Sequence, residues 1–167
     1  MQPKLDEKDK EILRLIQDNC KLTAREIAKK IGPPITTVFA KIKRMEQTGI
    51  IKEYRAILET SKLDFGTTAF ILASVSYGRG SKEDLPTQRD IAKEIAKLPG
   101  VQEVQIISGD WDLLIKLKGK DVETVGKFVI DSLRLVKGVE KTLTCMVFET
   151  VKETTEIPIT PSKKFAR

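Results

Sequence analysis

The chain of 167 residues contains no histidine, so the most common general base and metal ligand of proteins is missing. Nucleophiles of the Ser–His and Cys–His types and HExxH zinc sites are therefore excluded, and carboxylate or lysine catalysis would need positive signs of its own. Two cysteines, Cys20 and Cys145, lie far apart without CxxC spacing and are too few for a disulfide framework. We expect reduced, buried thiols in a protein that is not an enzyme, with no catalytic residue, metal or cofactor.

Aromatic residues make up only 5% of the chain, and long hydrophobic runs are missing. The core must therefore be built from isoleucine, leucine and valine. No stretch approaches the ~20 apolar residues that a membrane span needs, and the first six residues lack the apolar region of a secretory signal. We expect a cytoplasmic protein without membrane contact.

The positive charge of the chain is concentrated in its first third. The formal net charge is +6, and residues 1–62 hold 14 Lys and Arg against 9 Asp and Glu, whereas residues 63–167 hold 16 against 15. A basic part joined to a nearly neutral remainder indicates a module that binds a polyanion such as nucleic acid. A lysine-rich solvated surface would give the same counts, so charge alone leaves both interpretations open.

Local signals near the N-terminus predict two helices in succession. Asp6, with Asp9 three residues later, is typical of a helix start. Thr23 with Glu26 is a capping-box pattern and begins the second helix. Gly32 suits the left-handed turn at the end of that helix.

A third helix is predicted from about Pro34 or Ile35 to Thr48, with two unlike faces. The apolar positions, which are expected to pack inward, are Ile35, Val38, Ile42 and Met45. The opposite face is polar and basic and comprises Thr36, Thr37, Ala40, Lys43, Arg44 and Gln47. This arrangement predicts a helix-turn-helix unit whose third helix enters the DNA major groove. A plain three-helix bundle with a solvated face is the alternative.

A strand is expected directly after the third helix, over residues 50–58, because β-branched and aromatic side chains are frequent there. Lys52 and Arg55 lie in this segment. Their side chains would either contact phosphates beside the helix or only keep an edge strand soluble. The pattern does not separate these two interpretations.

The remaining hundred residues predict the order β-α-β-β-α-β. Strands are expected at residues 65–77, 101–107, 113–117 and 139–147, and helices at residues 88–98 and 122–135. This is the ferredoxin-like split arrangement, with both helices on one face of an antiparallel sheet. The other face is partly apolar and has nothing in the chain to cover it, which predicts oligomerisation or a ligand site.

Three motifs occur in order along the chain. They are Leu5-Asp6-x-x-Asp9-x-x-Ile12-Leu13, Val38-x-x-x-Ile42-Lys43-Arg44-Met45-Glu46-x-x-Gly49-Ile50-Ile51 and Gly109-Asp110-Trp111-Asp112-Leu113-Leu114. Through them, residues 4–150 resemble the Lrp/AsnC (feast/famine) family of prokaryotic transcription regulators. The motifs look like that family's opening helix, its recognition helix with exit strand, and the Gly-x-x-Asp turn of its ligand-sensing domain.

The resemblance implies a sequence-specific regulator that binds double-stranded DNA as a homodimer joined through sheet domains and exit strands. Such dimers often assemble further, into a tetramer or octamer, and an amino acid or similar effector commonly binds between dimers near the Gly-x-x-Asp turn. The chain departs from the family at Pro34, where Ser is usual, and at Lys41, where Arg is common, so the operator sequence stays open. The loop from Gly78 to Pro86 is also long.

The predicted fold class is therefore α+β. An N-terminal three-helix winged helix-turn-helix domain covers residues 1–50, and a linker strand covers residues 51–63. A ferredoxin-like, ligand-sensing and dimerisation domain covers residues 64–150, and a C-terminal extension covers residues 151–167.

Two sets of site residues follow from these patterns and this resemblance. The expected DNA contacts are Arg25, Thr36, Thr37, Ala40, Lys41, Lys43, Arg44, Lys52 and Arg55. The expected effector contacts are Gly109, Asp110, Trp111, Asp112, Thr142 and Thr144. For the second set the alternative is a hairpin turn that bonds its own backbone beside an interface tryptophan.

An architectural DNA-binding protein without sequence preference is the other candidate function. Sirohaem decarboxylases also resemble the family, but their chemistry is associated with histidine.

Overall fold

The computed structural model describes residues 4–76 and 86–159, so most of the loop from Gly78 to Pro86 lies outside the described residues. The chain divides into two compact units, with boundaries between Ile57 and Leu58 and between Val151 and Lys152. Each unit is described by itself below. Among the described residues, no helix is both long enough and apolar enough to cross a membrane.

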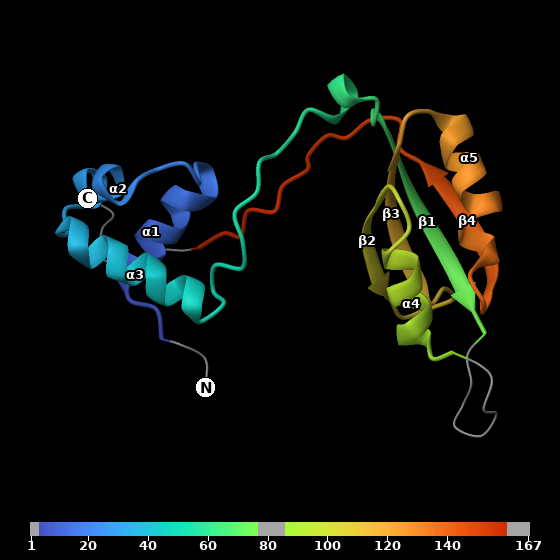
Figure 1. The fold of residues 1–167 in the computed structure, drawn as a ribbon, viewed down its shortest axis with the longest axis horizontal. Coiled ribbons are helices and arrows are strands. Elements are labelled where there is room, and N and C mark those ends of the chain that lie inside the picture. The colour runs from blue at the N-terminus through green and yellow to red at the C-terminus, as the bar shows by residue number, and fades with distance from the viewer. Residues whose placement is uncertain (1–3, 77–85, 160–167) are drawn as a thin grey trace. The chain divides into compact units, whose positions relative to one another are not determined.

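The first unit is built on three helices, as the local signals predict (Figure 1). Their bounds are Glu7–Asp18 for α1, Ala24–Ile31 for α2 and Ile35–Gln47 for α3. The short connection between α2 and α3 and the order of the three helices confirm the helix-turn-helix prediction.

The predicted helix caps are present in the structure. The Asp6 side chain accepts from the Asp9 backbone N–H while the Asp9 side chain accepts from the Asp6 N–H, so two free donors of the first turn are satisfied. Thr23 and Glu26 form the same reciprocal pair at the start of α2. Gly32 ends α2 at φ +90°, a left-handed conformation that glycine adopts without a Cβ clash.

The core of the first unit is aliphatic and involves all three helices. Its members with no exposed surface are Ile12, Ile27, Val38 and Met45. Two of the residues expected to pack inward on α3 are less covered, since Ile42 is half-buried and Ile35 is 46% exposed. Helical side chains lean towards the N-terminus of their helix. Ile35 is the first residue of α3, so its side chain points beyond the end of the helix, where the core does not cover it.

The exit strand expected over residues 50–58 is not formed within this chain. Residues 52–59 have no regular secondary structure, and they are followed by a 3₁₀ turn, η1, at Thr60–Leu63. A β-strand requires a hydrogen-bonded neighbour, and in the described part of the chain no strand pairs with this segment. The β-rich composition of the segment is therefore not sufficient to make it a strand.

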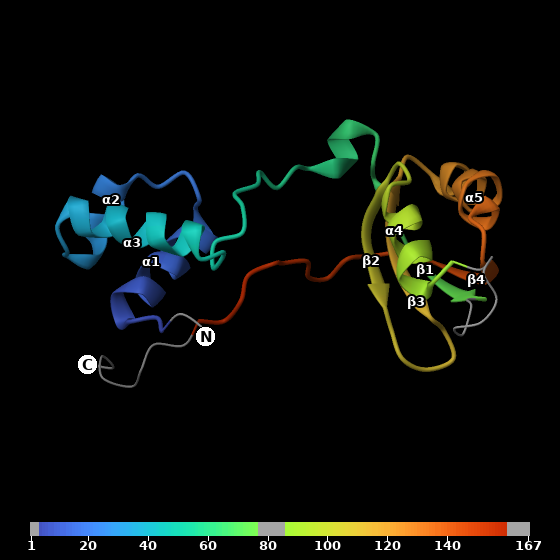
Figure 2. The same ribbon diagram turned by 60° about the horizontal axis from the view of Figure 1, so that its bottom comes forward.

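The second unit has the predicted β-α-β-β-α-β order. Its elements are β1 (Thr67–Val75), α4 (Gln88–Ala96), β2 (Val101–Ile106), β3 (Leu113–Gly119), α5 (Val122–Asp131), the 3₁₀ turn η2 (Leu133–Leu135) and β4 (Val139–Met146). The strand order is β2-β3-β1-β4, and every neighbouring pair is antiparallel. This is the ferredoxin-like arrangement, and α4 and α5 cover the same face of the sheet (Figures 1 and 2).

The two faces of the sheet differ because side chains alternate along each strand. One side of the central pair carries Ile71 opposite Ile115, both fully buried, and this side forms the core with residues of α4 and α5. The other side carries Phe70, which is 37% exposed, and Leu143, which is 46% exposed. The expectation of a partly apolar, uncovered face is confirmed for the described residues.

The expectation of buried thiols is wrong, because Cys20 and Cys145 are both exposed. Cys145 lies opposite Phe70 and so on the uncovered face of the sheet.

The C-terminal extension belongs to the first unit although it follows the last strand of the second. The Gln17 side chain on α1 donates to the Ile157 carbonyl at 3.2 Å and accepts from the Ile157 N–H at 2.8 Å. Two residues further on, Ile159 packs against the helical core. The segment was expected only as a polar extension, and its role as a cover for α1 follows from contacts across 140 residues of sequence.

We predict that Gln17→Ala lowers the free energy of unfolding of the first unit by about 1 kcal/mol, because the two hydrogen bonds that hold the extension are lost. Native-state hydrogen exchange of the α1 amides measures this loss separately from the second unit. In a variant that lacks residues 157–167, the same substitution should have no effect. An equal loss in both backgrounds would contradict the docking of the extension on α1.

Candidate nucleic-acid interface

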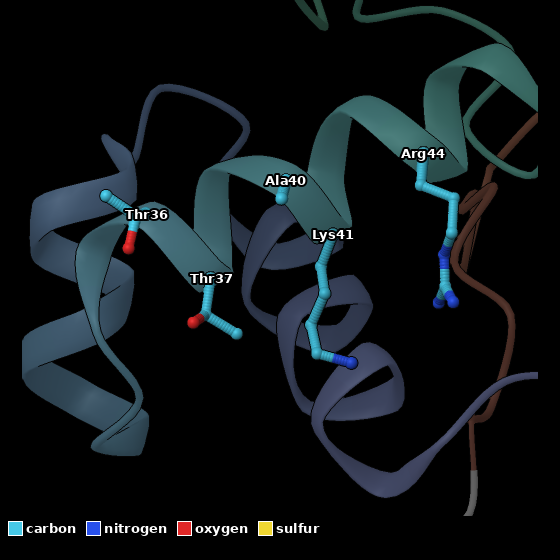
Figure 3. Close-up of a pocket in the computed structure, with 5 residues that line it drawn as sticks. All are labelled: Thr36, Thr37, Ala40, Lys41 and Arg44. Carbon is cyan, nitrogen blue, oxygen red and sulfur yellow. The ribbon is translucent and has the colours of Figure 1, made fainter.

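One side of α3 forms a shallow, open depression of about 420 Å³. It is lined by Thr36, Thr37, Ala40, Lys41 and Arg44, whose side chains project from the same side of the helix (Figure 3). The spacing of four residues explains this, because positions i and i+4 are neighbours on a helix surface. All but Lys41 are exposed residues.

The outward direction of this face is fixed by the opposite side of α3. Val38 and Met45 have no exposed surface and pack into the core of the helical unit. They are seven residues apart and so lie on one face of the helix. Burying both side chains turns Thr36 and Ala40 towards solvent.

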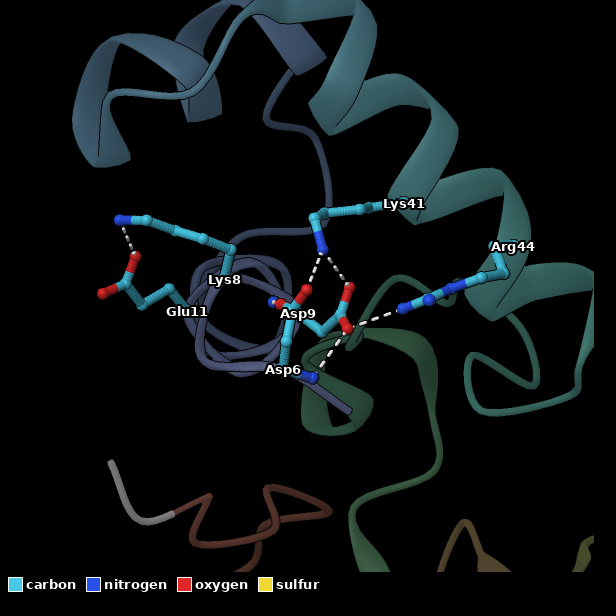
Figure 4. Close-up of polar contacts among 6 residues, drawn as sticks. All are labelled: Asp6, Lys8, Asp9, Glu11, Lys41 and Arg44. Atoms are coloured by element: carbon cyan, nitrogen blue, oxygen red, sulfur yellow. Dashed lines mark hydrogen bonds and ion pairs between the residues drawn. The ribbon is translucent and has the colours of Figure 1, made fainter. Parts of the chain in front are cut away.

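A carboxylate cluster on α1 holds the basic side chains of α3 (Figure 4). Asp9 is fully buried, and its Oδ1 lies 3.1 Å from Lys41 Nζ while its Oδ2 lies 2.5 Å from Arg44 Nη2. The Lys41 ammonium also pairs with the Asp6 carboxylate. A buried carboxylate is costly unless it is paired and hydrogen-bonded, and here both partners come from α3.

The cluster keeps Asp6 and Lys41 in their charged forms at neutral pH. The hydrogen bond from the Lys41 ammonium and that from the Asp9 N–H lower the pKa of Asp6 from 3.8 to about 2. Burial alone would lower the pKa of Lys41, but its bonds to Asp6 and Asp9 outweigh this, and the pKa of Lys41 is raised. The attraction therefore persists over the whole neutral range.

Lys41 and Arg44 differ in their availability to an outside partner. The Lys41 side chain is only 17% exposed, and its ammonium lies between two carboxylates, whereas the sequence pattern placed it among the DNA contacts. The Arg44 side chain is 49% exposed, and its contact with Asp9 uses one of the five donors of a guanidinium. Arg44 can thus contact Asp9 and a second acceptor together with four donors to spare. The Lys41 ammonium has used two of its three donors on Asp6 and Asp9, so one donor remains.

The remaining basic residues expected at DNA all belong to the first unit and are exposed: Arg25, Lys43, Lys52 and Arg55. Arg25 lies on α2 and Lys43 on α3. The Arg55 guanidinium pairs with Glu53 at 3.0 Å but stays 77% exposed. Each of them is therefore accessible to a phosphate.

Two features of this surface were missed by sequence reasoning. Asp6 and Asp9 were recognised only as helix-capping residues, and nothing in the local pattern indicated that they would pair with α3. Phe39 was assigned to neither face of α3, yet it is 61% exposed. Its spacing of three residues from Thr36 and four from Lys43 was the available signal.

The Gly-x-x-Asp turn of the second unit is held in place by its own aspartate. The Asp112 carboxylate accepts from the Val75 N–H at 2.9 Å and from the Gln88 side chain at 3.3 Å. Gly109 has φ +114°, which favours glycine, while Asp110 is exposed and Trp111 is half-buried. The turn therefore presents Asp110 to solvent and uses Asp112 internally.

Thr142 and Thr144 are not brought directly against this turn. They lie on β4 opposite Ala73 and Ile71 of β1, whereas the Asp112 N–H donates to the Ala73 carbonyl from the other side of β1. Strand β1 thus separates them from the turn by two inter-strand steps, roughly 10 Å. The Thr142 hydroxyl accepts from Arg134 at 3.4 Å.

Replacing Asp6 by Asn tests the carboxylate cluster, because Asn retains the capping oxygen but not the charge. Asp6 is 58% exposed, so solvent screens its attraction to Lys41, and we expect Asp6→Asn to lower the free energy of unfolding at pH 7 by no more than about 1 kcal/mol. Because the folded-state pKa of Asp6 is lowered, its contribution is present above about pH 4 and is lost as the pH falls from 3.8 to about 2.

Thermal unfolding of the wild type and Asp6→Asn between pH 7 and pH 2.5 measures this difference. The two stabilities should converge over the acid half of the range. In a Lys41→Gln background the Asp6→Asn effect should be smaller at pH 7, and an unchanged effect would show that the ammonium is not its cause.

Each of the two units matches a known protein family. The winged helix-turn-helix DNA-binding family matches residues 5–52, and the Lrp/AsnC ligand binding domain matches residues 68–157. These two matches correspond to the helical unit and to the sheet unit.

Individual relatives match over nearly their whole length. An HTH-type transcriptional regulator of Pyrococcus abyssi is 44% identical over 89% of this chain and 96% of its own. The HTH-type transcriptional regulator FL11 of Pyrococcus horikoshii is 36% identical over 95% of this chain and 99% of its own. A transcriptional regulator of Neisseria meningitidis, solved as a complex with L-Met, superimposes with a TM-score of 0.83 at 28% identity, covering 93% of this chain and 97% of that one. The chain therefore belongs to the Lrp/AsnC family of helix-turn-helix transcription regulators.

Proposed function

We propose that this regulator reads its operator with the exposed face of α3. The observation that carries the proposal is the outward face of Thr36, Ala40 and Arg44, opposite the fully buried Val38 and Met45. Helix-turn-helix proteins place the N-terminal residues of this helix against base edges in the major groove. Short side chains at positions 36 and 40 let the helix backbone approach the bases.

The basic residues have different roles in this proposal. Arg44 contacts a base edge, with guanine as the preferred acceptor, while Asp9 holds one edge of its guanidinium. Arg25, Lys43, Lys52 and Arg55 contact phosphates and set the register of the protein on the duplex. Lys41 positions α3 against α1 through Asp6 and Asp9, and its remaining donor can add one phosphate contact.

A dimer would present two such helices to one duplex. The uncovered apolar face of the sheet supports dimerisation, since Phe70 and Leu143 are exposed on it. Two symmetric copies read half-sites whose centres lie about one helical turn apart, roughly 34 Å along the DNA. A tetramer or octamer would be built from such dimers.

Selection from a random DNA library, followed by binding titrations at several salt concentrations, tests the reading of sequence by α3. Arg44→Ala should weaken binding to the selected operator by about 1–3 kcal/mol and relax the preference at one position of each half-site. Lys43→Ala should weaken all sequences alike and reduce the salt slope by about one unit.

Lys97→Ala is the matched control, because Lys97 is an exposed lysine of the second unit and pairs only with its helical neighbour Glu94 in the described contacts. An unchanged base preference in Arg44→Ala would remove Arg44 from sequence reading. If the library yields no motif and nonspecific competitor DNA displaces the protein readily, the protein is an architectural DNA binder and not a specific regulator.

We further propose that the turn at Gly109–Asp112 contributes to binding an amino-acid effector. The support is the exposed Asp110 carboxylate, which suits an α-ammonium group, beside the half-buried Trp111, which offers an apolar surface. The related regulator of Neisseria meningitidis was solved with L-Met. Asp112 maintains the turn and Thr142 and Thr144 lie further away, so Gly109, Asp110 and Trp111 are the primary contacts.

Thermal unfolding of the purified protein in the presence of each of the twenty amino acids tests this proposal. A ligand at 100 times its Kd should stabilise the protein by about 2.7 kcal/mol, which is a clear shift of the midpoint. Asp110→Ala should abolish the shift, while Thr144→Val should preserve it. No shift with any amino acid would contradict an amino-acid effector.

A further inference from the structure

We propose that Phe39 reads thymine in the operator by packing its ring against the C5-methyl group in the major groove. The inference rests on the proposed function, because it requires α3 to lie in that groove. It goes further by assigning a specificity contact to an apolar residue outside the polar face and by naming the base that this residue selects.

The exposure of Phe39 is the first observation. Its side chain is 61% exposed, although Val38 beside it has no exposed surface at all. One exposed aromatic residue is unremarkable by itself. Ile35, however, lies four residues earlier on the same side of α3 and is 46% exposed, so the two form an apolar strip along the first half of the helix.

The position of the strip relative to the proposed DNA-reading face is the second observation. Phe39 lies three residues after Thr36 and four residues before Lys43, and both spacings make helical neighbours. The strip therefore adjoins the face lined by Thr36 and Ala40 and does not lie on the buried side. It occupies the N-terminal half of α3, which is the half that helix-turn-helix proteins insert most deeply.

The chemistry of the surroundings identifies the occupant of the strip. Lys43, one turn after Phe39, flanks the strip with positive charge, so the complementary partner is a polyanion that also offers an apolar group. In the major groove the C5-methyl of thymine is such a group, and Phe, Ala and the Thr methyl are side chains that contact it. Phe39, with the Thr36 methyl one turn before it, gives α3 a preference for A·T pairs.

Uracil substitution tests this contact without changing the protein. After the operator has been selected, each of its thymines is replaced in turn by deoxyuridine, which keeps the base pair and removes only the methyl group. Binding of the full-length protein is then titrated at fixed salt. Loss of one buried methyl contact should weaken wild-type binding by about fourfold at one or two positions in each half-site.

The Phe39→Ala variant completes the test as a double-mutant cycle. Phe39→Ala should weaken binding to the thymine operator, and uracil at the sensitive positions should then have no further effect. Val122→Ala, which shortens an equally exposed apolar side chain on α5, should bind both operators like the wild type. The Phe39→Leu variant, which keeps an apolar group, should retain part of the discrimination.

The outcomes separate this inference from the proposed function. If a specific operator is found but no thymine is sensitive to uracil, or if uracil weakens Phe39→Ala as much as the wild type, Phe39 does not read thymine while sequence reading by α3 stands. If Phe39→Ala changes the oligomeric state, the strip is a contact between copies of the chain and the inference fails. If no operator is selected, both proposals fail together.

Discussion

The pairing of the buried Asp9 carboxylate with two cations of α3 is the constraint on which the DNA-binding unit depends. A carboxylate without exposed surface requires compensation, and Lys41 and Arg44 provide it from another helix. The ion pairs therefore fix how α3 lies against α1. They also neutralise part of the positive charge that α3 would otherwise offer to a phosphate. The electrostatic attraction of this surface to phosphates is therefore weaker, but the Arg44 guanidinium is held in a defined orientation.

In the proposed complex, α3 offers three kinds of contact to DNA. Small side chains at Thr36 and Ala40 allow a close approach, Arg44 supplies a directional donor, and Phe39 adds an apolar group. In the same proposal, phosphate contacts come from Lys43 on α3 and from side chains on other segments of the unit, such as Arg25 and Lys52. This division separates the groups that hold the helix in the groove from those that distinguish the bases.

The two units of the chain are covalently connected at two places, between Ile57 and Leu58 and between Val151 and Lys152. The second connection exists because the C-terminal extension returns to α1, where Gln17 and Ile159 hold it. In the second unit, Asp112 joins the turn after β2 to β1 and α4. A ligand at that turn would therefore contact a segment that is hydrogen-bonded to the middle of the sheet.

The sequence by itself determined the helices, their caps and the order of helices and strands along the chain, because these features depend on residues within about four positions of one another or on simple periodicity. The capping pair Thr23 and Glu26 is an example. It could not determine whether residues 50–58 form a strand, because this depends on a partner strand. Only the tertiary structure decided that Asp9 would bind residues 32 and 35 positions away. The same holds for the return of the extension to Gln17. Such contacts arise from the packing of whole elements, and no local pattern encodes which residues that packing brings together.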